Sequence, residues 1–135
     1  MVCIYCCGTT QVSNSRPQKR TNTVWRRRRC NTCSAVFTSE ESAQYDAAWL
    51  VTQPSGAVEP FSRDRLLISL HKSLGHRKTA IADAGGLVDT VIKKLLADSR
   101  SNGTIDVTRI VQIVLVALNR FDKAAASHYQ AFHRV

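Results

Sequence analysis

The spacing of apolar residues after the first third of the chain predicts a β-hairpin followed by helices. Two short apolar segments, residues 49–51 and 58–61, flank a Gln-Pro-Ser-Gly turn at 53–56, which is typical of a β-hairpin. Ser62 then stands where it can cap a helix, and Gly75 stands where it can end one. The apolar residues between them recur at helical spacing: Leu66, Leu67, Leu70 and Leu74.

The same periodicity predicts three more helices. Apolar residues from 87 to 96 mark the second helix, which should end before Asn102-Gly103. Thr108 is placed to cap a third helix, which is apolar on nearly every side from 110 to 118 and is therefore expected to be buried. Asp122 is placed to cap a short last helix. The second part of the chain is thus expected to be mainly helical, with a hairpin at its start.

Two Cys-x-x-Cys pairs, Cys3/Cys6 and Cys30/Cys33, lie in the first quarter of the chain. Four thiolates at this spacing can surround one zinc ion tetrahedrally, and the segment between the pairs is long enough to form a β-hairpin. We therefore predict a zinc ribbon. Cys7 directly follows Cys6 and offers zinc a second acceptable spacing, so Cys6 is favoured as the ligand while Cys7 stays the alternative.

Disulfides are the alternative interpretation of the cysteines. The sequence shows no secretory leader and no run of about 18 apolar residues that would span a membrane. We therefore expect a cytoplasmic protein without a membrane partner, in a compartment where thiols stay reduced and bind zinc.

The basic residues are concentrated around the cysteines. The chain has a formal net charge of +9, and no Asp or Glu occurs between Met1 and Ser39. Part of this charge offsets the roughly two negative charges of a zinc ion with four thiolates. The excess predicts binding to double-stranded DNA, although a solvated run of charge is the simpler alternative. The predicted DNA-binding residues are Arg16, Lys19, Arg20, Arg26, Arg27, Arg28 and Arg29. In a strand, two of the four consecutive arginines would face the duplex and two the zinc or solvent.

The chain of 135 residues has room for the ribbon and one further domain of about 85 to 90 residues. The polar stretch from Ser39 to Asp46 marks the boundary. We expect an α+β protein, with a β zinc ribbon at 1–46 and a mainly helical domain at 47–135.

In these features the chain resembles the NrdR family, bacterial repressors of ribonucleotide reductase genes that join a zinc ribbon to an ATP-cone. The resemblance covers nearly the whole length. The residues on which it rests are Cys3-x-x-Cys6, Ser15-Arg16, the arginine run before Cys30-x-x-Cys33, Phe37-Thr38, Glu41, Gly56 to Glu59-Pro60-Phe61, and Asp122-Lys123.

The resemblance implies a sensor of deoxynucleotide supply. Family members bind ATP or dATP in the cone, which is a nucleotide-binding and oligomerisation domain, and change their homo-oligomeric state. Their ribbons bind paired operator boxes in DNA. The positions that match the family's nucleotide pocket are Val51, Gln53, Glu59 and Arg65. The expected cofactors are Zn²⁺ and ATP/dATP.

The sequence also departs from the family pattern. Gln53-Pro54 replaces a Lys-Arg pair that reaches nucleotide phosphates, Trp25 stands where the first arginine of the run should be, and Cys7 stands where a glycine follows the second cysteine. His128-Tyr129 replaces an Arg-Phe pair, and the last helix lacks its usual extra turn.

Two alternatives follow from these departures. The first is a ribbon protein whose degenerate cone serves only oligomerisation. The second is a regulatory fragment of a nucleotide-metabolism enzyme. The sequence contains no Ser-His-Asp or paired-carboxylate constellation, and four thiolates would close the zinc site, so we predict no enzymatic activity.

Overall fold

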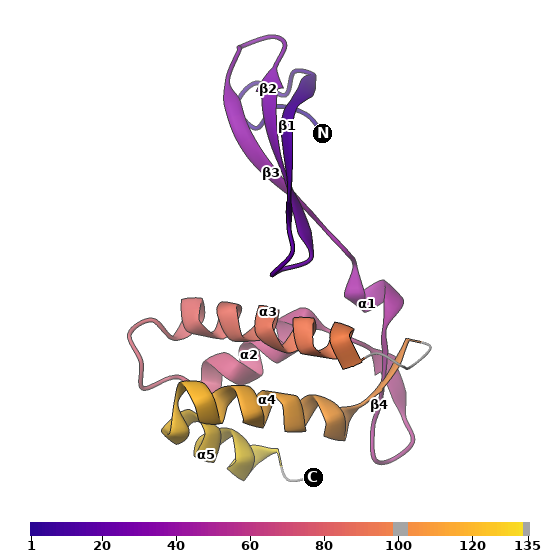
Figure 1. Cartoon of the computed structure of the whole chain (residues 1–135), viewed down its shortest axis with the longest axis vertical. Coiled ribbons are helices and arrows are strands. Elements are labelled where there is room, and N and C mark those ends of the chain that lie inside the picture. The colour runs from indigo at the N-terminus through magenta and orange to yellow at the C-terminus, as the bar shows by residue number, and fades with distance from the viewer. Residues whose placement is uncertain (99–102, 134–135) are drawn as a thin grey trace. The chain divides into compact units, whose positions relative to one another are not determined.

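The computed structural model describes residues 1–98 and 103–133 (Figure 1). The chain divides into two compact units, Met1–Ala43 and Gln44–Val135. Strands with four cysteines form the first unit, and a mainly helical part with a β-hairpin forms the second, which confirms the predicted α+β fold class.

The first unit is a three-stranded antiparallel sheet in the order β1-β2-β3. Its strands are β1 (Thr10–Gln18), β2 (Thr23–Cys30) and β3 (Val36–Ser42). The hairpin expected between the cysteine pairs is present as β1 and β2, with a bulge between Val12 and Asn14.

Strand β3 was not predicted, because its second half consists of the polar residues assigned to the boundary. Its pairing with β2 explains why these residues are ordered as a strand. Arg28 donates through Nε to Ser39 Oγ at 2.8 Å, and Arg26 donates through Nε to Glu41 Oε2 at 2.8 Å. The polar side chains of β3 are therefore partners of the arginines on β2.

The second unit consists of α1 (Tyr45–Ala48), β4 (Leu50–Thr52), β5 (Val58–Pro60), α2 (Arg63–Ser73), α3 (Ala80–Asp98), β6 (Thr104–Asp106), α4 (Val107–Phe121) and α5 (Lys123–Phe132). Strands β4 and β5 form the predicted hairpin, and β6 pairs with β4 in parallel. In Figure 1, α2 to α5 pack beside one another. Their apolar faces and the small sheet enclose one core, in which Leu70, Leu74 and Leu118 are fully buried.

The ends of the helices are mostly where the sequence predicts them. Ser62 Oγ accepts from Arg65 N at the start of α2, and Asp122 caps α5. The prediction that Thr108 caps the third helix is wrong. Asp106 is the N-cap of α4, and its carboxylate accepts from Thr108 N at 2.8 Å.

Two further predictions about the helices need correction. Helix α3 begins at Ala80, seven residues or about two turns before the predicted apolar segment. Its predicted end before Asn102 lies outside the described residues. Helix α4 is not buried on all sides, because Val116 is 47% exposed. The residues that α4 buries lie on one face, so Val116 on the outer face stays in solvent.

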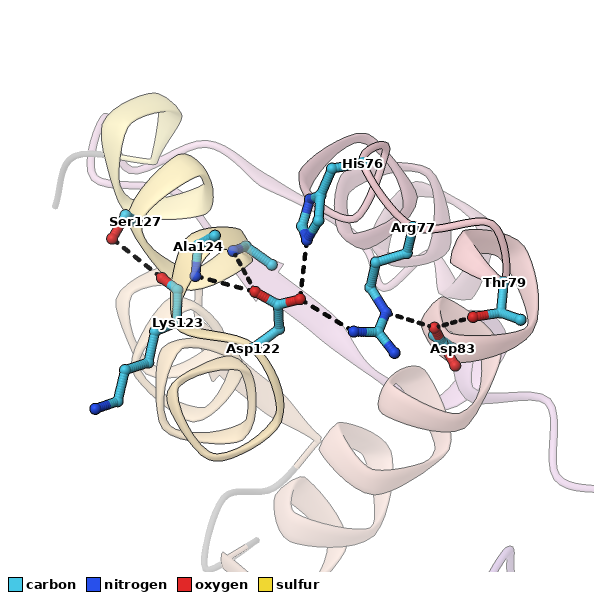
Figure 2. Close-up of polar contacts among 9 residues, drawn as sticks. His76, Arg77, Thr79, Asp83, Asp122, Lys123, Ala124 and Ser127 are labelled. Atoms are coloured by element: carbon cyan, nitrogen blue, oxygen red, sulfur yellow. Dashed lines mark hydrogen bonds and ion pairs between the residues drawn. The ribbon is translucent and has the colours of Figure 1, made fainter.

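A polar network joins the connection between α2 and α3 to the junction between α4 and α5 (Figure 2). Asp122 Oδ2 lies 2.9 Å from His76 Nε2 and accepts from Arg77 NH1 at 3.2 Å. Arg77 also donates through Nε to Asp83 on α3 at 2.8 Å, and its guanidinium lies 4.8 Å from the centre of the Phe121 ring. Asp122 therefore caps one helix and holds a loop that belongs to two others.

Candidate functional sites

The four predicted zinc ligands converge in the first unit. The Sγ atoms of Cys3, Cys6, Cys30 and Cys33 all lie within 4.8 Å of one another, with Cys3 and Cys33 3.7 Å apart and Cys6 and Cys30 3.5 Å apart. A tetrahedral site with Zn–S bonds of about 2.3 Å places sulfur atoms about 3.8 Å apart. The donor set and its spacing therefore fit a structural zinc ion. Cys7 is exposed and lies outside this group.

The two cysteine pairs form matching turns. In each, the N–H of the first cysteine donates to the carbonyl five residues later, and its sulfur accepts from the N–H two residues later. The bonds are Cys3 N to Gly8 O at 2.8 Å, Cys30 N to Ala35 O at 2.9 Å, Tyr5 N to Cys3 Sγ at 3.5 Å and Thr32 N to Cys30 Sγ at 3.3 Å. N–H groups directed at sulfur stabilise the thiolate form that binds a metal.

The residue after each cysteine pair adopts an unusual backbone conformation. Cys7 and Ser34 both adopt the left-handed backbone region, with φ of 58° and 59°. Gly8 has a different role. A Cβ built on Gly8 would lie 2.5 Å from Thr32 Oγ1, so glycine is what lets the two turns approach each other.

The electrostatics of the cluster favour a bound cation. The backbone N–H groups of Cys33 and Thr32 lower the pKa of Cys30 to about 6. The N–H of Gly8 lowers the pKa of Cys6, but hydrogen bonds with the thiols of Cys33, Cys30 and Cys3, together with burial, raise it overall to about 12. The Cys30 thiolate therefore forms easily, whereas ionisation of Cys6 beside it is disfavoured. A divalent metal ion removes this mutual repulsion.

The arginine run alternates between the two faces of β2, as the sequence predicts for a strand. Arg26 and Arg28 are half-buried, whereas Arg27 and Arg29 are exposed. The guanidinium of Arg26 is held by Glu41 at 2.7 Å and by Ser15 Oγ at 3.0 Å. Arg26 and Arg28 therefore serve mainly the packing of their own sheet.

The opposite face of the sheet combines cations with an aromatic ring. Arg16 pairs with Trp25 across β1 and β2, and Trp25 is 48% exposed. A hollow of about 200 Å³ lies here, lined by Asn14, Arg16, Trp25, Arg27 and Thr38. We call this surface, together with Arg29, the exposed basic face. Lys19 and Arg20, the remaining predicted DNA-binding residues, lie exposed in the turn between β1 and β2.

The four predicted nucleotide-binding residues meet at one cavity in the second unit. Val51 on β4, Glu59 on β5 and Arg65 on α2 line a cavity of about 270 Å³, together with Gln53 from the hairpin turn. Its apolar walls include residues that no local pattern in the sequence marks as ligand contacts. These are Phe61, Leu66, Val107, Ile110, Val111 and Tyr129.

Glu59 is the centre of the polar edge of this cavity. Its Oε1 accepts from Gln53 Nε2 at 2.6 Å, and its Oε2 accepts from Arg65 NH1 at 2.5 Å. The hydrogen bond from Arg65, supported by the one from Gln53, lowers the pKa of Glu59, so this carboxylate stays ionised at neutral pH. The cavity thus presents an apolar interior and an edge with one negative and one positive group.

Four convergent cysteines on a small antiparallel sheet define the class of this molecule, a zinc-ribbon protein. Residues 1–41 match the family model described as transcriptional repressor NrdR-like, N-terminal domain.

Proteins named transcriptional repressor NrdR are similar to nearly all of the chain. The one from Rhodospirillum centenum is 31% identical over 99% of this chain and 86% of its own length. Those from Maricaulis maris and Tropheryma whipplei are 33% and 31% identical, over 96% and 98% of this chain and 82% and 89% of their own lengths. The chain belongs to the NrdR family of transcriptional repressors.

Membership of this family settles the coarse function. The chain is a regulator and not an enzyme, and a transcriptional repressor has DNA as its partner. The family's zinc ribbon and the four close cysteines also support Zn²⁺ as its metal. Within the described residues, no helix is long and apolar enough to span a bilayer.

Proposed function

We propose that this protein is a cytoplasmic, nucleotide-responsive repressor that binds operator DNA upstream of ribonucleotide reductase genes. The ribbon, residues 1–46, binds the DNA. Residues 47–135 form an ATP-cone, whose occupation by ATP or dATP controls the homo-oligomeric state and hence the DNA affinity. The observation that carries the proposal is the meeting of Val51, Gln53, Glu59 and Arg65 at one cavity.

The exposed basic face is the part of the ribbon that meets the duplex. Arg26 and Arg28 are engaged by Glu41, Ser39 and other groups of their own sheet, so bringing them to phosphate would break these contacts. Arg27 and Arg29 lie exposed on the other face, where such a loss does not arise. Exposed arginines give affinity through counterion release and sequence preference through guanine edges.

We therefore expect Arg27→Ala to weaken operator binding about tenfold and to reduce the salt slope by about one. Fluorescence anisotropy on a duplex from the promoter of its own ribonucleotide reductase genes, repeated across a salt series, measures both quantities. Arg26→Ala is the matched control and should change the slope much less. An equal loss in Arg26→Ala would place the duplex on the other face of the sheet.

The nucleotide part of the proposal rests on the composition of the cavity. An adenine ring suits the apolar walls, and Gln53 and Glu59 at the edge supply hydrogen-bonding groups for a base or ribose. Nucleotide binding is coupled to DNA binding if the nucleotide-bound and nucleotide-free forms of the protein assemble into different oligomers. Only some assemblies then space the ribbons to match paired operator boxes.

We expect Arg65→Ala to lower the affinity for both ATP and dATP about tenfold, because it removes a charge-assisted contact and leaves the Glu59 carboxylate without its cation. Isothermal titration calorimetry of the zinc-loaded protein measures this. Arg63→Ala is the control, because Arg63 lies on the same helix but pairs with Asp89. Similar losses in both variants would mean that the effect is not specific to the cavity.

A cone that serves only assembly is the rival function, and Gln53-Pro54 is the observation that favours it. Anisotropy with no nucleotide, with ATP and with dATP separates the two. Our proposal requires the operator affinity to differ between the two nucleotides. Tight operator binding that is indifferent to both, with no saturable heat at micromolar nucleotide, would establish the rival.

A further inference from the structure

A second cavity of the helical unit, between α2 and α5, adjoins the candidate nucleotide cavity. It has a volume of about 480 Å³. Arg65, Ser69 and His133 belong to the linings of both cavities, so the two adjoin along these residues, and Ser69 Oγ lies 3.0 Å from His133 Nε2 at this border. We call the second cavity the α2–α5 groove.

The groove is built for an anion. It is lined by the cations Arg65 and Lys72, by the imidazoles of His128 and His133, by the hydroxyls of Ser69 and Ser73, and by the apolar side chains of Ile68 and Phe132. None of these lining residues is acidic, although the Arg65 guanidinium also bonds Glu59 at the neighbouring cavity. The neighbouring cavity, by contrast, has the carboxylate of Glu59 at its hairpin end. The two cavities together therefore run from a negative end at the hairpin to a positive end over α2 and α5.

The spacing along α2 suits an extended anion. Arg65 and Lys72 are seven residues apart, which places them on one helix face and about 10 Å apart along the axis. A chain of phosphates has the length to meet cations at both ends of this span. Ser69 lies between the two cations on the same face, and its Oγ lies 3.0 Å from His133 Nε2.

The two histidines are held in fixed orientations. His133 stacks on Tyr129 with the ring centres 3.9 Å apart, and it donates from Nδ1 to the Tyr129 carbonyl at 3.0 Å. His128 lies with Nδ1 3.4 Å from Ser73 Oγ, and that hydroxyl donates to the Ser69 carbonyl. Ser73 thus accepts from His128 Nδ1, so the free Nε2 edge of His128 donates to an anion when the ring carries a proton on both nitrogens.

From this geometry we propose that the α2–α5 groove binds the polyphosphate chain of the nucleotide, with Lys72 and His128 as specific contacts. The proposal rests on the proposed nucleotide function and names the phosphate-binding residues of the same site. The adenosine lies against the apolar walls and Glu59, and the phosphates extend over α2.

The test compares zinc-loaded wild type, Lys72→Gln and Lys72→Gln/His128→Asn by calorimetry with adenosine, ADP, ATP and inorganic triphosphate. We expect Lys72→Gln to lower the ATP affinity about tenfold, the ADP affinity less and the adenosine affinity not at all. The double variant should lose more. Lys78→Gln is the matched control, because Lys78 is exposed outside the groove.

Each outcome decides one of the two proposals. Equal ATP affinity in wild type and Lys72→Gln overturns the groove as the phosphate site while leaving the nucleotide function intact. Binding of inorganic triphosphate that depends on Lys72, without any binding of adenosine or ATP, keeps the groove as an anion site and removes the nucleotide function. A loss for adenosine as large as for ATP overturns the phosphate assignment, and a changed far-ultraviolet helical signal would trace that loss to misfolding.

Discussion

Cys30→Ser should release the zinc, unfold the ribbon and abolish operator binding, while the helical unit stays folded. The ribbon has almost no apolar core of its own, since its buried cluster consists of Cys3, Cys30 and Phe37 with Ala35 packed against it. Two of these three buried residues are candidate metal ligands. The binding free energy of a structural zinc ion, about 10–16 kcal/mol in small zinc modules, is then the main source of folding stability for the sheet. Losing the sheet removes the exposed basic face.

The helical unit is expected to survive this substitution because its core is separate. That core contains residues from Trp49 to Tyr129 and no cysteine. Zinc content by metal analysis, operator affinity by anisotropy and helix content by circular dichroism measure the three expected results. We expect operator affinity to fall at least about a hundredfold. A collapse of the helical signal would contradict the independence of the two units.

Cys7→Ser is the matched control for the metal site. Cys7 is exposed, adopts the left-handed backbone and lies outside the cluster of four sulfurs. Serine also occupies the equivalent position of the second turn, at Ser34, so it tolerates this conformation. Zinc content and operator affinity should therefore stay at the wild-type level. Loss of zinc from Cys7→Ser would make Cys7 the ligand in place of Cys6.

The parts of this fold that could be predicted are those with local chemical signals. Metal-ligand spacing gave the ribbon, the Pro-Ser-Gly turn gave the β4–β5 hairpin, and capping side chains gave the starts of α2 and α5. Strand β6 carries no such signal, because it has three residues and exists only through parallel pairing with a distant strand. Asp106 and Thr108 are both good caps, and only the path of the chain decides between them.

The candidate sites divide in the same way. The cysteines were predicted from their spacing, whereas the nucleotide-binding roles of the hairpin residues and Arg65 were expected only from the family resemblance. The α2–α5 groove was not predicted, since Lys72 and His128 lie far apart in the sequence and become neighbours only when α5 packs on α2. The alternation of the arginines was predictable from strand geometry. The sequence did not show which two arginines Glu41 and Ser39 would hold, because strand β3 was not predicted.

Asp122→Ala should lower the melting temperature of the helical unit by about 5–10 °C. The carboxylate accepts from the N–H groups of Ala124 and Ala125, which α5 cannot satisfy internally, and it also bonds His76 and Arg77 (Figure 2). Losing it uncaps α5 and releases the α2–α3 connection together. Asp122→Ser separates the two roles, because a serine hydroxyl caps the helix but carries no charge. We expect its melting temperature to lie between those of wild type and Asp122→Ala.

The charge of Asp122 also predicts a dependence on pH. The N–H of Ala125, supported by His76 and Arg77, lowers the pKa of Asp122 from 3.8 to about 2 in the folded protein. A lowered pKa means that this stabilisation is fully present above the unfolded value near pH 4 and is lost as the pH falls toward 2. Asp122→Asn keeps the shape of the side chain without the titrating group. Thermal melts of both proteins should therefore differ most at neutral pH and converge as the pH approaches 2. Equal melting temperatures of the two proteins at every pH would mean that Asp122 stabilises the unit through shape and not through charge.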